Sequence, residues 1–390
     1  MYKISSIYWA YRNKVTNKLF GVVKMRHKGK RSGNALVSFI TGPFTKAPWE
    51  FFTDPHSNYW TSKEIVRLLN VRGYDVDIIN WDNKTFIPKK KYAICIDIQH
   101  NLERLSPRLG SSCVKVMFVL SSYPLFQNNA EQTRIDNLEK RRGVKFSHKR
   151  HDVLSNNIKY IDFISGYGNE TVYKTYPLKD KKIVPIPAPA VKTYKFPKDK
   201  NFEKVQTHFL FFGGGGAILK GLDLVVEAFS TMPNLHLHIV GPAAYEKEFA
   251  KEYEKEFALP NIHRYQRPKI SKNGIMTVGE KLFSEIADQC ASMIYPSASE
   301  GTSGAVIQAM YAGVIPVVTK ATGLPEDSPS IIIENPSVES IISLAQKISE
   351  MDSKILRKMA YDSWKYVNIH HTKEKFSETY ADFIDNVIKL

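Results

Sequence analysis

The sequence predicts two α/β domains that face each other across a cleft, and three observations support this fold class. The chain has 390 residues, which is too long for one ordinary core and suits two domains of similar size. Apolar, strand-like runs alternate with helical patterns in both halves, which indicates βαβ units and parallel sheets. A proline-rich stretch at 183–200 interrupts the alternation and is expected to be an extended linker.

Within the first half, the alternation predicts four strands and two helices. The helix at 61–73 has Thr61 or Ser62 as its cap and Gly73 as its stop. The expected strands are 35–41, 74–79, 92–98 and 114–120, and the other expected helix is 128–143. Polar-aromatic loops are expected at 121–131 and 165–176.

After the linker, a second alternating series begins. Its expected strands are 207–213, 235–241, 292–296 and 314–319, and its expected helices are 222–232, 280–290 and 303–313, with a further helical stretch over 352–390. The sequence therefore divides into a basic N-terminal segment (1–33), a first domain (34–190), a linker (191–205), a second domain (206–365) and a C-terminal helix (366–390) that can pack back on the first domain.

Charge is spread unevenly along the chain. The net charge of +16 divides into +20 for residues 1–200 and −4 for the remainder. Such an asymmetry suggests that one domain faces a polyanion, either nucleic acid or an anionic membrane leaflet. No helix-turn-helix, zinc-finger or RNA-recognition pattern supports nucleic acid. Residues 1–33 hold nine basic residues interleaved with aromatic ones and no acid, which fits either a lipid interface or a partly ordered, solvated tail.

Composition narrows the class of protein further. Hydrophobic residues at 43% and aromatic residues at 12% exclude a largely disordered chain. Cys95, Cys113 and Cys290 are widely spaced, so they form neither a metal-ligand cluster nor a disulfide framework, and a reducing cytoplasm is expected. No apolar run approaches the roughly 18 to 20 residues that span a bilayer, and no signal-peptide core is seen. We expect a cytoplasmic protein, with peripheral binding to the inner face of the cell membrane as an option.

The strongest functional pattern is PSASEGTSGAVIQAMYAGVIPVV, residues 296–318. After an expected buried strand, a polar loop carries Glu300, and a helix begins near 302–304. Gly301 and Gly304 allow the backbone to approach a ligand closely. Free N–H groups at the helix start form a natural site for a diphosphate. A bare strand–turn–helix is more often structural, but the full string is much more specific than its parts.

A second pattern is FLFFGGGGAILKGLDLVVEAF, residues 209–229. A strand runs into four glycines, and Lys220 follows just before a helix. The pattern is not a P-loop, because Lys220 lies between Leu219 and Gly221 rather than before Ser or Thr. The glycines allow a ligand to come close and Lys220 supplies a positive charge; alternatively, the segment is a flexible surface loop with a solvated lysine.

Together these strings resemble the second domain of glycosyltransferase family 4 and its relatives. The resemblance covers residues 207–320 well and the first half only loosely. It implies the GT-B fold, in which two Rossmann-like domains face each other across a cleft, and a nucleotide-sugar donor whose diphosphate is bound by the lysine and the glycine-rich helix start. The implied donor-binding residues are Gly213, Gly214, Gly215, Lys220, Glu300, Gly301, Thr302, Ser303, Gly304 and Gln308.

Two departures from the family pattern concern the same site. The family's second glutamate, which binds the ribose, is replaced by Gln308, about two helical turns after Glu300. Glutamine can still donate to and accept from hydroxyl groups, so it is interpreted as a tolerated variant. The family's arginine in the glycine loop is missing, because residues 213–216 are all glycine, and fewer charges are left for the phosphates.

The first half offers weaker candidates. His56 and Asn58 precede or begin the helix at 61–73, and His100 follows the strand at 92–98, at the sheet edge where open α/β sheets bind ligands. By resemblance, Glu300 orients the sugar, and His56 or His100 assists near the acceptor hydroxyl, although a lone histidine is more often structural.

Resemblance to envelope-polysaccharide transferases adds Asn128 and Asn169 as acceptor-side candidates. The basic turn HKRH (148–151) is interpreted as solvated, or as a site for an anionic acceptor. The aspartates of DVD (75–77) are not expected to bind a metal, because they flank an apolar strand and the implied fold usually needs none. No cofactor is expected.

The combined interpretation is a glycosyltransferase of surface polysaccharide synthesis, such as lipopolysaccharide or capsule, with a glycan or lipid-linked oligosaccharide as acceptor and retention of the anomeric configuration. Two alternatives are a non-catalytic scaffold of the same fold in a polysaccharide assembly complex, which the two departures motivate, and a sugar-nucleotide epimerase, which would need no separate acceptor.

Overall fold

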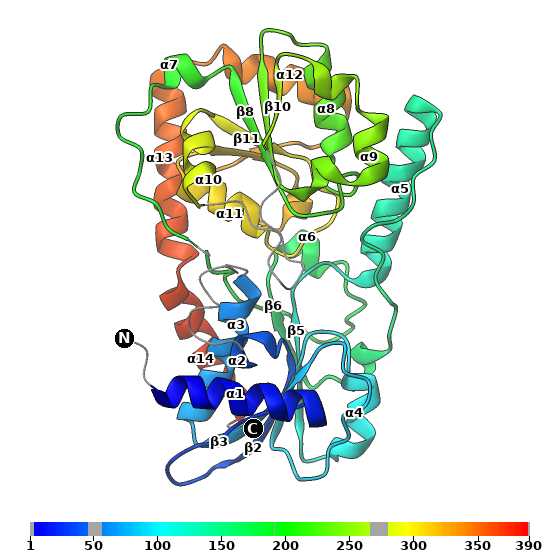
Figure 1. Cartoon of the computed structure of the whole chain (residues 1–390), viewed down its shortest axis with the longest axis vertical. Coiled ribbons are helices and arrows are strands. Elements are labelled where there is room, and N and C mark those ends of the chain that lie inside the picture. Colours follow the sequence, from blue (N-terminus) through cyan, green and yellow to red (C-terminus); the bar gives the residue numbers. More distant parts are fainter. Residues whose placement is uncertain (1–3, 46–56, 191, 266–279, 389–390) are drawn as a thin grey trace.

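The computed structural model describes residues 4–45, 57–190, 192–265 and 280–388. Within these ranges the chain forms two sheets, each flanked by helices, and Figure 1 shows the second domain above the first. All sheet neighbours are parallel except one pair at the edge of the first sheet. The two α/β domains that the sequence predicts are therefore confirmed.

The first sheet has the strand order β1-β3-β2-β4-β5-β6-β7. Its strands are β1 (Val23–Met25), β2 (Gly33–Phe39), β3 (Tyr74–Asn80), β4 (Ile94–Asp97), β5 (Val114–Val119), β6 (Phe163–Gly166) and β7 (Val184–Pro185). Its helices are α1 (Ile4–Phe20), α2 (Gly42–Thr45), α3 (Ser57–Val71), α4 (Leu102–Leu109), α5 (Pro124–Arg142) and α6 (Glu170–Tyr173). The residues that follow β5 contact the second domain, so the carboxyl edge of this sheet faces it.

The basic N-terminal segment is part of the first domain. Strand β1 lies at the edge of the first sheet and pairs with β3 in antiparallel fashion. Arg26 lies 3.2 Å from the carboxylate of Asp77, and Arg31 lies 3.4 Å from that of Asp75. Part of the positive charge of this segment therefore neutralises the two buried aspartates of DVD. The described residues of this segment, 4–33, are therefore folded against the first domain and do not form a solvated tail.

Helix α5 replaces the loop that the sequence predicts at 121–131. It begins at Pro124, because proline has a suitable φ for the first turn and lacks the N–H that would stay unpaired there. It ends at Arg142, and Gly143 closes it with a left-handed φ of 74° and an N–H bonded to the carbonyl of Glu139. The helix leaves the first domain and runs beside the second (Figure 1).

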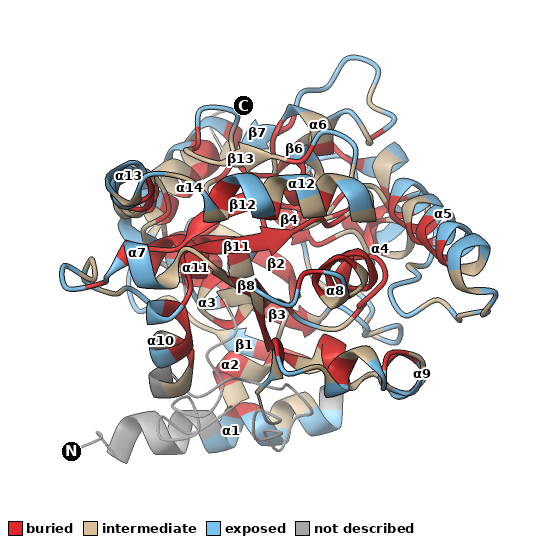
Figure 2. Cartoon of the chain, turned by 90° about the horizontal axis from the view of Figure 1, so that it is seen from above, coloured by how far each residue is buried: buried red, intermediate tan, exposed pale blue. Residues whose placement is uncertain are grey.

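The second sheet has the order β10-β9-β8-β11-β12-β13. Its strands are β8 (His208–Phe212), β9 (His236–Val240), β10 (Ile262–Arg264), β11 (Ser292–Tyr295), β12 (Ile315–Val318) and β13 (Ile331–Ile332). Its helices are α7 (Phe202–Val205), α8 (Leu222–Ser230), α9 (Lys247–Glu252), α10 (Glu280–Asp288), α11 (Gly304–Tyr311) and α12 (Val338–Ser349). Every residue of β11 and β12 is buried, as expected for a parallel sheet covered on both faces (Figure 2).

The last two helices join the domains. Helix α13 (Ser353–His370) packs on α11 and β12, whereas α14 (Lys373–Ile388) packs on α3 of the first domain. Arg72 of α3 lies 2.6 Å from the carboxylate of Asp385, and the ring of Tyr380 packs edge-on against that of Phe118 in β5. No helix in the described ranges combines the length and the apolar character needed to cross a bilayer.

Candidate active site

Lys220 lies in the turn between β8 and α8. Its backbone N–H donates to the carbonyl of Gly216 at 3.0 Å. Gly221 then occupies the N-cap of α8 with a φ of 74°. A Cβ at Gly221 would lie 2.7 Å from Cγ and 2.8 Å from the carbonyl oxygen of Pro296. Only glycine fits this position, so the Lys-Gly pair fixes where the side chain of Lys220 enters the site.

A buried cluster of three polar side chains forms around Lys220. Its Nζ lies 2.7 Å from Oε1 of Glu300 and 2.8 Å from the hydroxyl of Tyr295. The Tyr295 hydroxyl in turn donates to Oε1 of Glu300 at 2.8 Å. The exposed fractions of the Lys220 and Glu300 side chains are 10% and 19%. The cluster is therefore largely shielded from water. In such an environment of low dielectric constant, its charges interact strongly.

The charges of Lys220 and Glu300 stabilise each other. Burial lowers the pKa of Lys220, but the opposite charge of Glu300 outweighs burial, so the pKa lies above its ordinary value. Burial raises the pKa of Glu300, but the charge and hydrogen bond of Lys220 outweigh burial and leave the pKa below its ordinary value. Burial also raises the pKa of Tyr295. At neutral pH the cluster therefore holds an ammonium, a carboxylate and a neutral phenol.

The start of α11 follows Glu300 directly. Ser303 is its N-cap, and the Ser303 side chain makes no capping hydrogen bond. The hydroxyl of Thr302 donates to the carbonyl of Gly323 at 3.1 Å, which holds the loop in place. A Cβ at Gly304 would meet nothing within 4 Å, so this turn faces open space. Helix starts of this kind bind anions through their unpaired N–H groups.

Gly301 is in close contact with the first domain. A Cβ at Gly301 would lie 2.2 Å from the carbonyl oxygen of Leu120, just after β5. The N–H and hydroxyl of Ser122 both donate to the Glu300 carbonyl, at 3.0 and 2.9 Å. The close approach that the sequence assigns to a ligand at Gly301 is thus made by protein backbone. These contacts bring the two domains together at Glu300.

The glycine loop is crowded on one side. A Cβ at Gly213 would lie 3.1 Å from the ring of Tyr295, whereas one at Gly214 would meet nothing within 4 Å. A Cβ at Gly215 would lie 3.2 Å from the Glu246 carboxylate, which also accepts hydrogen bonds from the N–H groups of the next two residues. The backbone N–H groups at the end of the loop therefore already donate hydrogen bonds to the carboxylate of Glu246.

Gln308 binds the linker in this structure. Its Nε2 donates to the carbonyl of Lys192 at 2.9 Å, and its Oε1 accepts from the N–H of Lys192 at 3.1 Å. Both ends of the side-chain amide are therefore engaged by one residue of the chain between the domains. The sequence assigns Gln308 to the ribose, and this geometry shows a different contact.

The two histidine candidates are not brought to the cluster. His56 lies outside the described residues. The His100 ring packs on that of Trp81 with centroids 4.8 Å apart, and burial lowers its pKa more than the nearby charge of Asp97 raises it, so the ring is neutral at pH 7. Across the described ranges, no hydrogen bond, ion pair or ring contact joins His100 to Lys220 or Glu300.

The asparagine candidates occupy three different places. Asn128 exchanges two hydrogen bonds with the backbone of Asp152, at 2.8 and 2.9 Å. Asn169 caps α6, and its Nδ2 donates to two carbonyls of the second domain at 2.9 and 2.8 Å. Asn58 is half-buried in the first turn of α3. Asn128 and Asn169 thus hold protein backbone, in the second case across the domain contact.

Two residues near the cluster were not identified from the sequence. Tyr295 ends an apolar strand, and nothing local indicates its polar partners. Arg150 belongs to the basic turn 148–151, and the run of basic residues in this turn was the only sequence feature that could have pointed to it. Its Cγ would lie 2.5 Å from a Cβ at Gly216, so the Arg150 side chain lies over the glycine loop.

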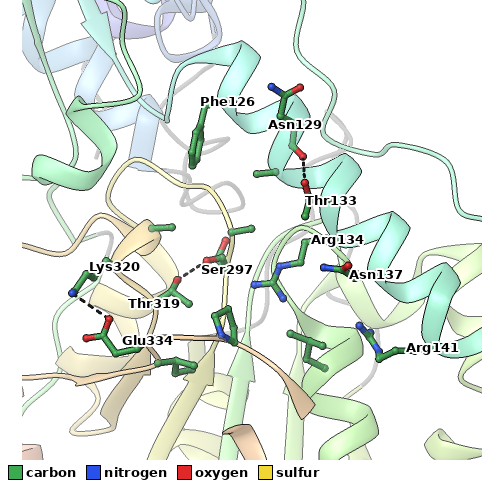
Figure 3. Close-up of a pocket in the computed structure, with 16 residues that line it drawn as sticks. Phe126, Asn129, Thr133, Arg134, Asn137, Arg141, Ser297, Thr319, Lys320 and Glu334 are labelled. Atoms are coloured by element: carbon green, nitrogen blue, oxygen red, sulfur yellow. Dashed lines mark hydrogen bonds and ion pairs between the residues drawn. The ribbon is translucent and has the colours of Figure 1, made fainter. Parts of the chain in front are cut away.

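A separate cavity lies beside this site. Figure 3 shows it between α5 and the loops that follow β11 and β12. Its volume is about 550 Å³. Arg134 and Arg141 reach it from α5, and Thr319 and Lys320 line it from the second domain. Lys220 and Glu300 are not among the residues that line this cavity.

Comparisons with known proteins concern mainly the second domain. The model of the family "Glycosyl transferases group 1" matches residues 206–351, which include both motifs of the second domain. No curated protein sequence matches the chain. The match is consistent with a glycosyltransferase.

Solved structures resemble the chain at low identity. Sucrose-phosphate synthase from Thermosynechococcus elongatus is 11% identical, with a TM-score of 0.61 over 92% of this chain and 100% of that one. Trehalose-6-phosphate synthase is 8% identical, with a TM-score of 0.57 over 91% and 99%. TarM from S. aureus is 13% identical, with a TM-score of 0.50 over 79% and 57%, so the aligned part spans little more than half of TarM. At these identities the likeness shows the fold, which is GT-B with two Rossmann-like domains.

Proposed function

We propose that this chain transfers a sugar from a nucleotide-diphosphate donor to a glycan or lipid-linked glycan, because residues 206–351 match the model of the family "Glycosyl transferases group 1". One observation carries the proposal: the buried Lys220–Glu300–Tyr295 cluster stands beside the open start of α11, where the domains meet. A cation and unpaired amides next to a carboxylate suit a diphosphate joined to a sugar.

Each group has a role in this reaction. The bond between the anomeric carbon and the donor diphosphate breaks, and the diphosphate leaves with the electron pair. Two N–H bonds of the Lys220 ammonium point to Tyr295 and Glu300, and the third is available to the diphosphate. Glu300 accepts hydrogen bonds from hydroxyl groups of the sugar. The acceptor hydroxyl forms the new bond to the anomeric carbon and passes its proton to an oxygen of the leaving diphosphate. Contact between the domains excludes competing water.

Retention of the anomeric configuration is part of the proposal. It is supported by the fold shared with trehalose-6-phosphate synthase, a structure obtained in work on enzymatic glycosyltransfer with retention. TarM was crystallised with UDP and alpha-GlcNAc-glycerol, which makes a UDP-sugar the first donor to test here. The anomer of the product, read by NMR, decides between retention and inversion.

Lys220 and the helix amides would stabilise the leaving diphosphate without a metal ion. Addition of a chelator should therefore leave the rate of transfer unchanged. A rate that falls with chelator and returns with Mg²⁺ or Mn²⁺ would contradict this part of the proposal.

The first experiment is a thermal-shift screen with UDP-, GDP-, dTDP- and CMP-sugars. We expect at least one diphosphate sugar to raise the melting temperature, and the monophosphate CMP-sugars to have no effect. Donor hydrolysis and transfer are then compared in the wild type, Lys220→Ala and Lys358→Ala. Lys358 is an exposed lysine paired with Asp362 at 2.6 Å, and it serves as the matched control.

Loss of one hydrogen-bond donor that stabilises charge in the transition state typically lowers the rate by about 10²- to 10³-fold. We expect this loss for Lys220→Ala and not for Lys358→Ala. Activity unchanged in Lys220→Ala, or no response to any nucleotide sugar, would overturn the proposal. A requirement for a separate acceptor distinguishes transfer from epimerisation.

A non-catalytic scaffold is a second candidate, favoured by the engagement of Gln308 with the linker. In that case the amide that would bind the donor ribose serves only to hold the linker. A scaffold would show neither nucleotide binding nor turnover, so the same screen decides between the two.

We also propose that α1 docks on an anionic membrane surface at the cytoplasmic face, where a lipid-linked acceptor of surface polysaccharide synthesis would lie. Tyr11, Val15 and Leu19 are spaced by four residues and exposed, and Lys14 and Lys18 flank them. Each basic side chain near an anionic surface adds about 1 kcal/mol. Vesicles containing phosphatidylserine should bind the wild type at low salt and bind Lys14→Glu/Lys18→Glu weakly. Equal binding to neutral vesicles would contradict docking.

A further inference from the structure

The backbone of Arg150 is fixed by α5. The carboxylate of Glu131, which is 2% exposed, accepts hydrogen bonds from the N–H of Arg150 at 3.0 Å and from that of Lys149 at 2.9 Å. The Nε2 of Gln127 donates to the Arg150 carbonyl at 2.8 Å. Both backbone groups of Arg150 are therefore held by the first domain, although its side chain is exposed.

The side chain of Arg150 crosses to the second domain. Its Cγ and Cδ would lie 2.5 and 3.0 Å from a Cβ at Gly216, so it lies against the glycine loop. Its charge also acts on the cluster: burial raises and Lys220 lowers the pKa of Glu300, and Arg150 lowers it further. No hydrogen bond or ion pair engages the Arg150 guanidinium among the residues that the structure describes.

The site needs such a charge. Glu300 offsets the ammonium of Lys220, so the cluster itself has no net charge. The four glycines at 213–216 contribute no charged side chain. A nucleoside diphosphate carries several negative charges, and a planar guanidinium binds phosphate oxygens in pairs. Arg150 is the cation placed to supply the missing charge.

We propose that Arg150, a residue of the first domain, binds the diphosphate of the donor over the glycine loop of the second domain. This inference rests on the proposed function and adds that the diphosphate site is divided between the domains. It follows that the donor itself draws the domains together, because its phosphates contact Lys220 on one side and Arg150 on the other. Arg150 completes the site only when the turn at 148–151 lies against the loop.

The test uses pairs of nucleotides that differ by one phosphate. Affinities of the full chain for UDP and UMP, and for GDP and GMP, are measured by calorimetry in the wild type, and the pair whose diphosphate binds is carried on. Arg150→Ala should weaken the diphosphate by about tenfold to a hundredfold, as expected for loss of charged hydrogen bonds, and change the monophosphate much less. Arg150→Lys, which keeps the charge without the paired donors, should fall between.

Two further variants separate the possible failures. Lys145→Ala removes one charge from the same segment, at a side chain that is 85% exposed, and should bind both nucleotides like the wild type. Lys220→Ala should lose diphosphate binding. If Arg150→Ala binds the diphosphate normally while Lys220→Ala does not, or if it loses both nucleotides equally, the role of Arg150 is overturned and the proposed function stands. If neither variant affects binding, the proposed function itself fails.

The fold of Arg150→Ala is expected to be intact, because the turn is held through the backbone of residue 150. Unchanged melting temperature without ligand checks this directly. If Arg150→Ala were less stable, Arg150→Lys would still decide, because a purely structural loss would affect di- and monophosphate alike.

Discussion

At the scale of single residues, the Lys220–Glu300 pair combines burial with opposite charges. Taking two ions out of water costs several kcal/mol each, and their attraction repays this only with good geometry. Here the ammonium, carboxylate and phenol satisfy one another at 2.7 to 2.8 Å. Removing one partner leaves the other as an uncompensated buried charge, which is more costly than removing both.

The pair predicts a specific dependence of stability on pH. The Glu300 pKa lies below its ordinary value of 4.5, so its contribution is present above that value and lost as the pH falls through the lowered pKa. The Lys220 pKa lies above 10.5, so its contribution is present below that value and lost as the pH rises through the raised pKa. Glu300→Gln should therefore lower the free energy of unfolding by about 3 to 5 kcal/mol near pH 7.

Urea unfolding from about pH 3 to pH 9 measures this difference. The gap between the wild type and Glu300→Gln should shrink as the pH falls from about 4.5 through the lowered Glu300 pKa, while Lys358→Ala should follow the wild type throughout. A gap that stays constant down to the lowest pH would show that the charge of Glu300 is not its source.

Gln308 allows a second prediction at this scale. In Gln308→Glu, a carboxylate oxygen replaces the Nε2 donor and faces the Lys192 carbonyl, so a hydrogen bond becomes a repulsion. The free energy of unfolding should fall by about 1 to 3 kcal/mol, and nucleotide affinity should not improve. Gln346→Glu, the same change at an exposed position of α12, is the control. Tighter nucleotide binding without loss of stability would instead support contact with the ribose.

At the scale of elements, the glycine before α8 links local conformation to the site. Gly221→Ala adds a methyl group both to a left-handed backbone and to a space 2.7 Å from Pro296. The left-handed backbone alone costs about 1 to 2 kcal/mol, and relief of the clash should move Lys220. We expect lower stability together with weaker diphosphate binding. Gly143→Ala, which has the same left-handed backbone with a φ of 74° but open space around its Cβ, is the matched control and should lose stability only.

Strands and helices with strong local patterns could be predicted from the sequence. The strands β8, β11 and β12 agree with the expected runs to within one or two residues, because buried parallel strands are short apolar runs bounded by loops. The short strands β7 and β13 were missed, since two residues carry no periodicity. The helix α4 was also missed, and it contains Pro107, which sequence patterns treat as a helix breaker.

The same limit applies to the site. Lys220 and Glu300 stand in local strings with glycines around them, and those strings predicted that they would share a site. Arg150 is brought to Gly216 only by the packing of α5 against the second domain, and Gln308 meets Lys192 only through the path of the linker. Contacts between such distant parts of the chain leave no periodic signal.

At the scale of the whole molecule, the uneven charge has a structural use. Arg141 lies 2.6 Å from Asp223 and 2.9 Å from Glu227 of α8, so part of the basic excess of the first domain is neutralised by acids of the second. The positive charge that remains for an external polyanion is smaller than the sequence alone suggests. The same ion pairs hold α5, and with it the turn of Arg150, against the glycine loop.

Substitution of Arg142 gives the sharpest test of whether ion pairs of α5 hold the two domains together. Its guanidinium lies 2.8 Å from Glu252 and 2.7 Å from Glu256 and packs over the ring of Tyr253, and no fully buried acid depends on it. Each of these partly exposed pairs contributes about 0.5 kcal/mol. Arg142→Glu replaces that attraction by repulsion, so the domains should separate more often, which raises the radius of gyration in X-ray scattering and weakens diphosphate binding several-fold.

Reversing the charge on the other side checks the interpretation. Arg142→Glu combined with Glu252→Arg and Glu256→Arg should restore both the compact form and the affinity, because the attraction is re-established with opposite signs. In wild-type protein, raising the salt concentration to about 1 M should act like a mild version of Arg142→Glu, since ion pairs at a partly exposed contact are screened. If the single variant scatters like the wild type at all salt concentrations, the apolar contact of α14 with the first domain is sufficient for closure, and the ion pairs of α5 serve only to position the turn at Arg150.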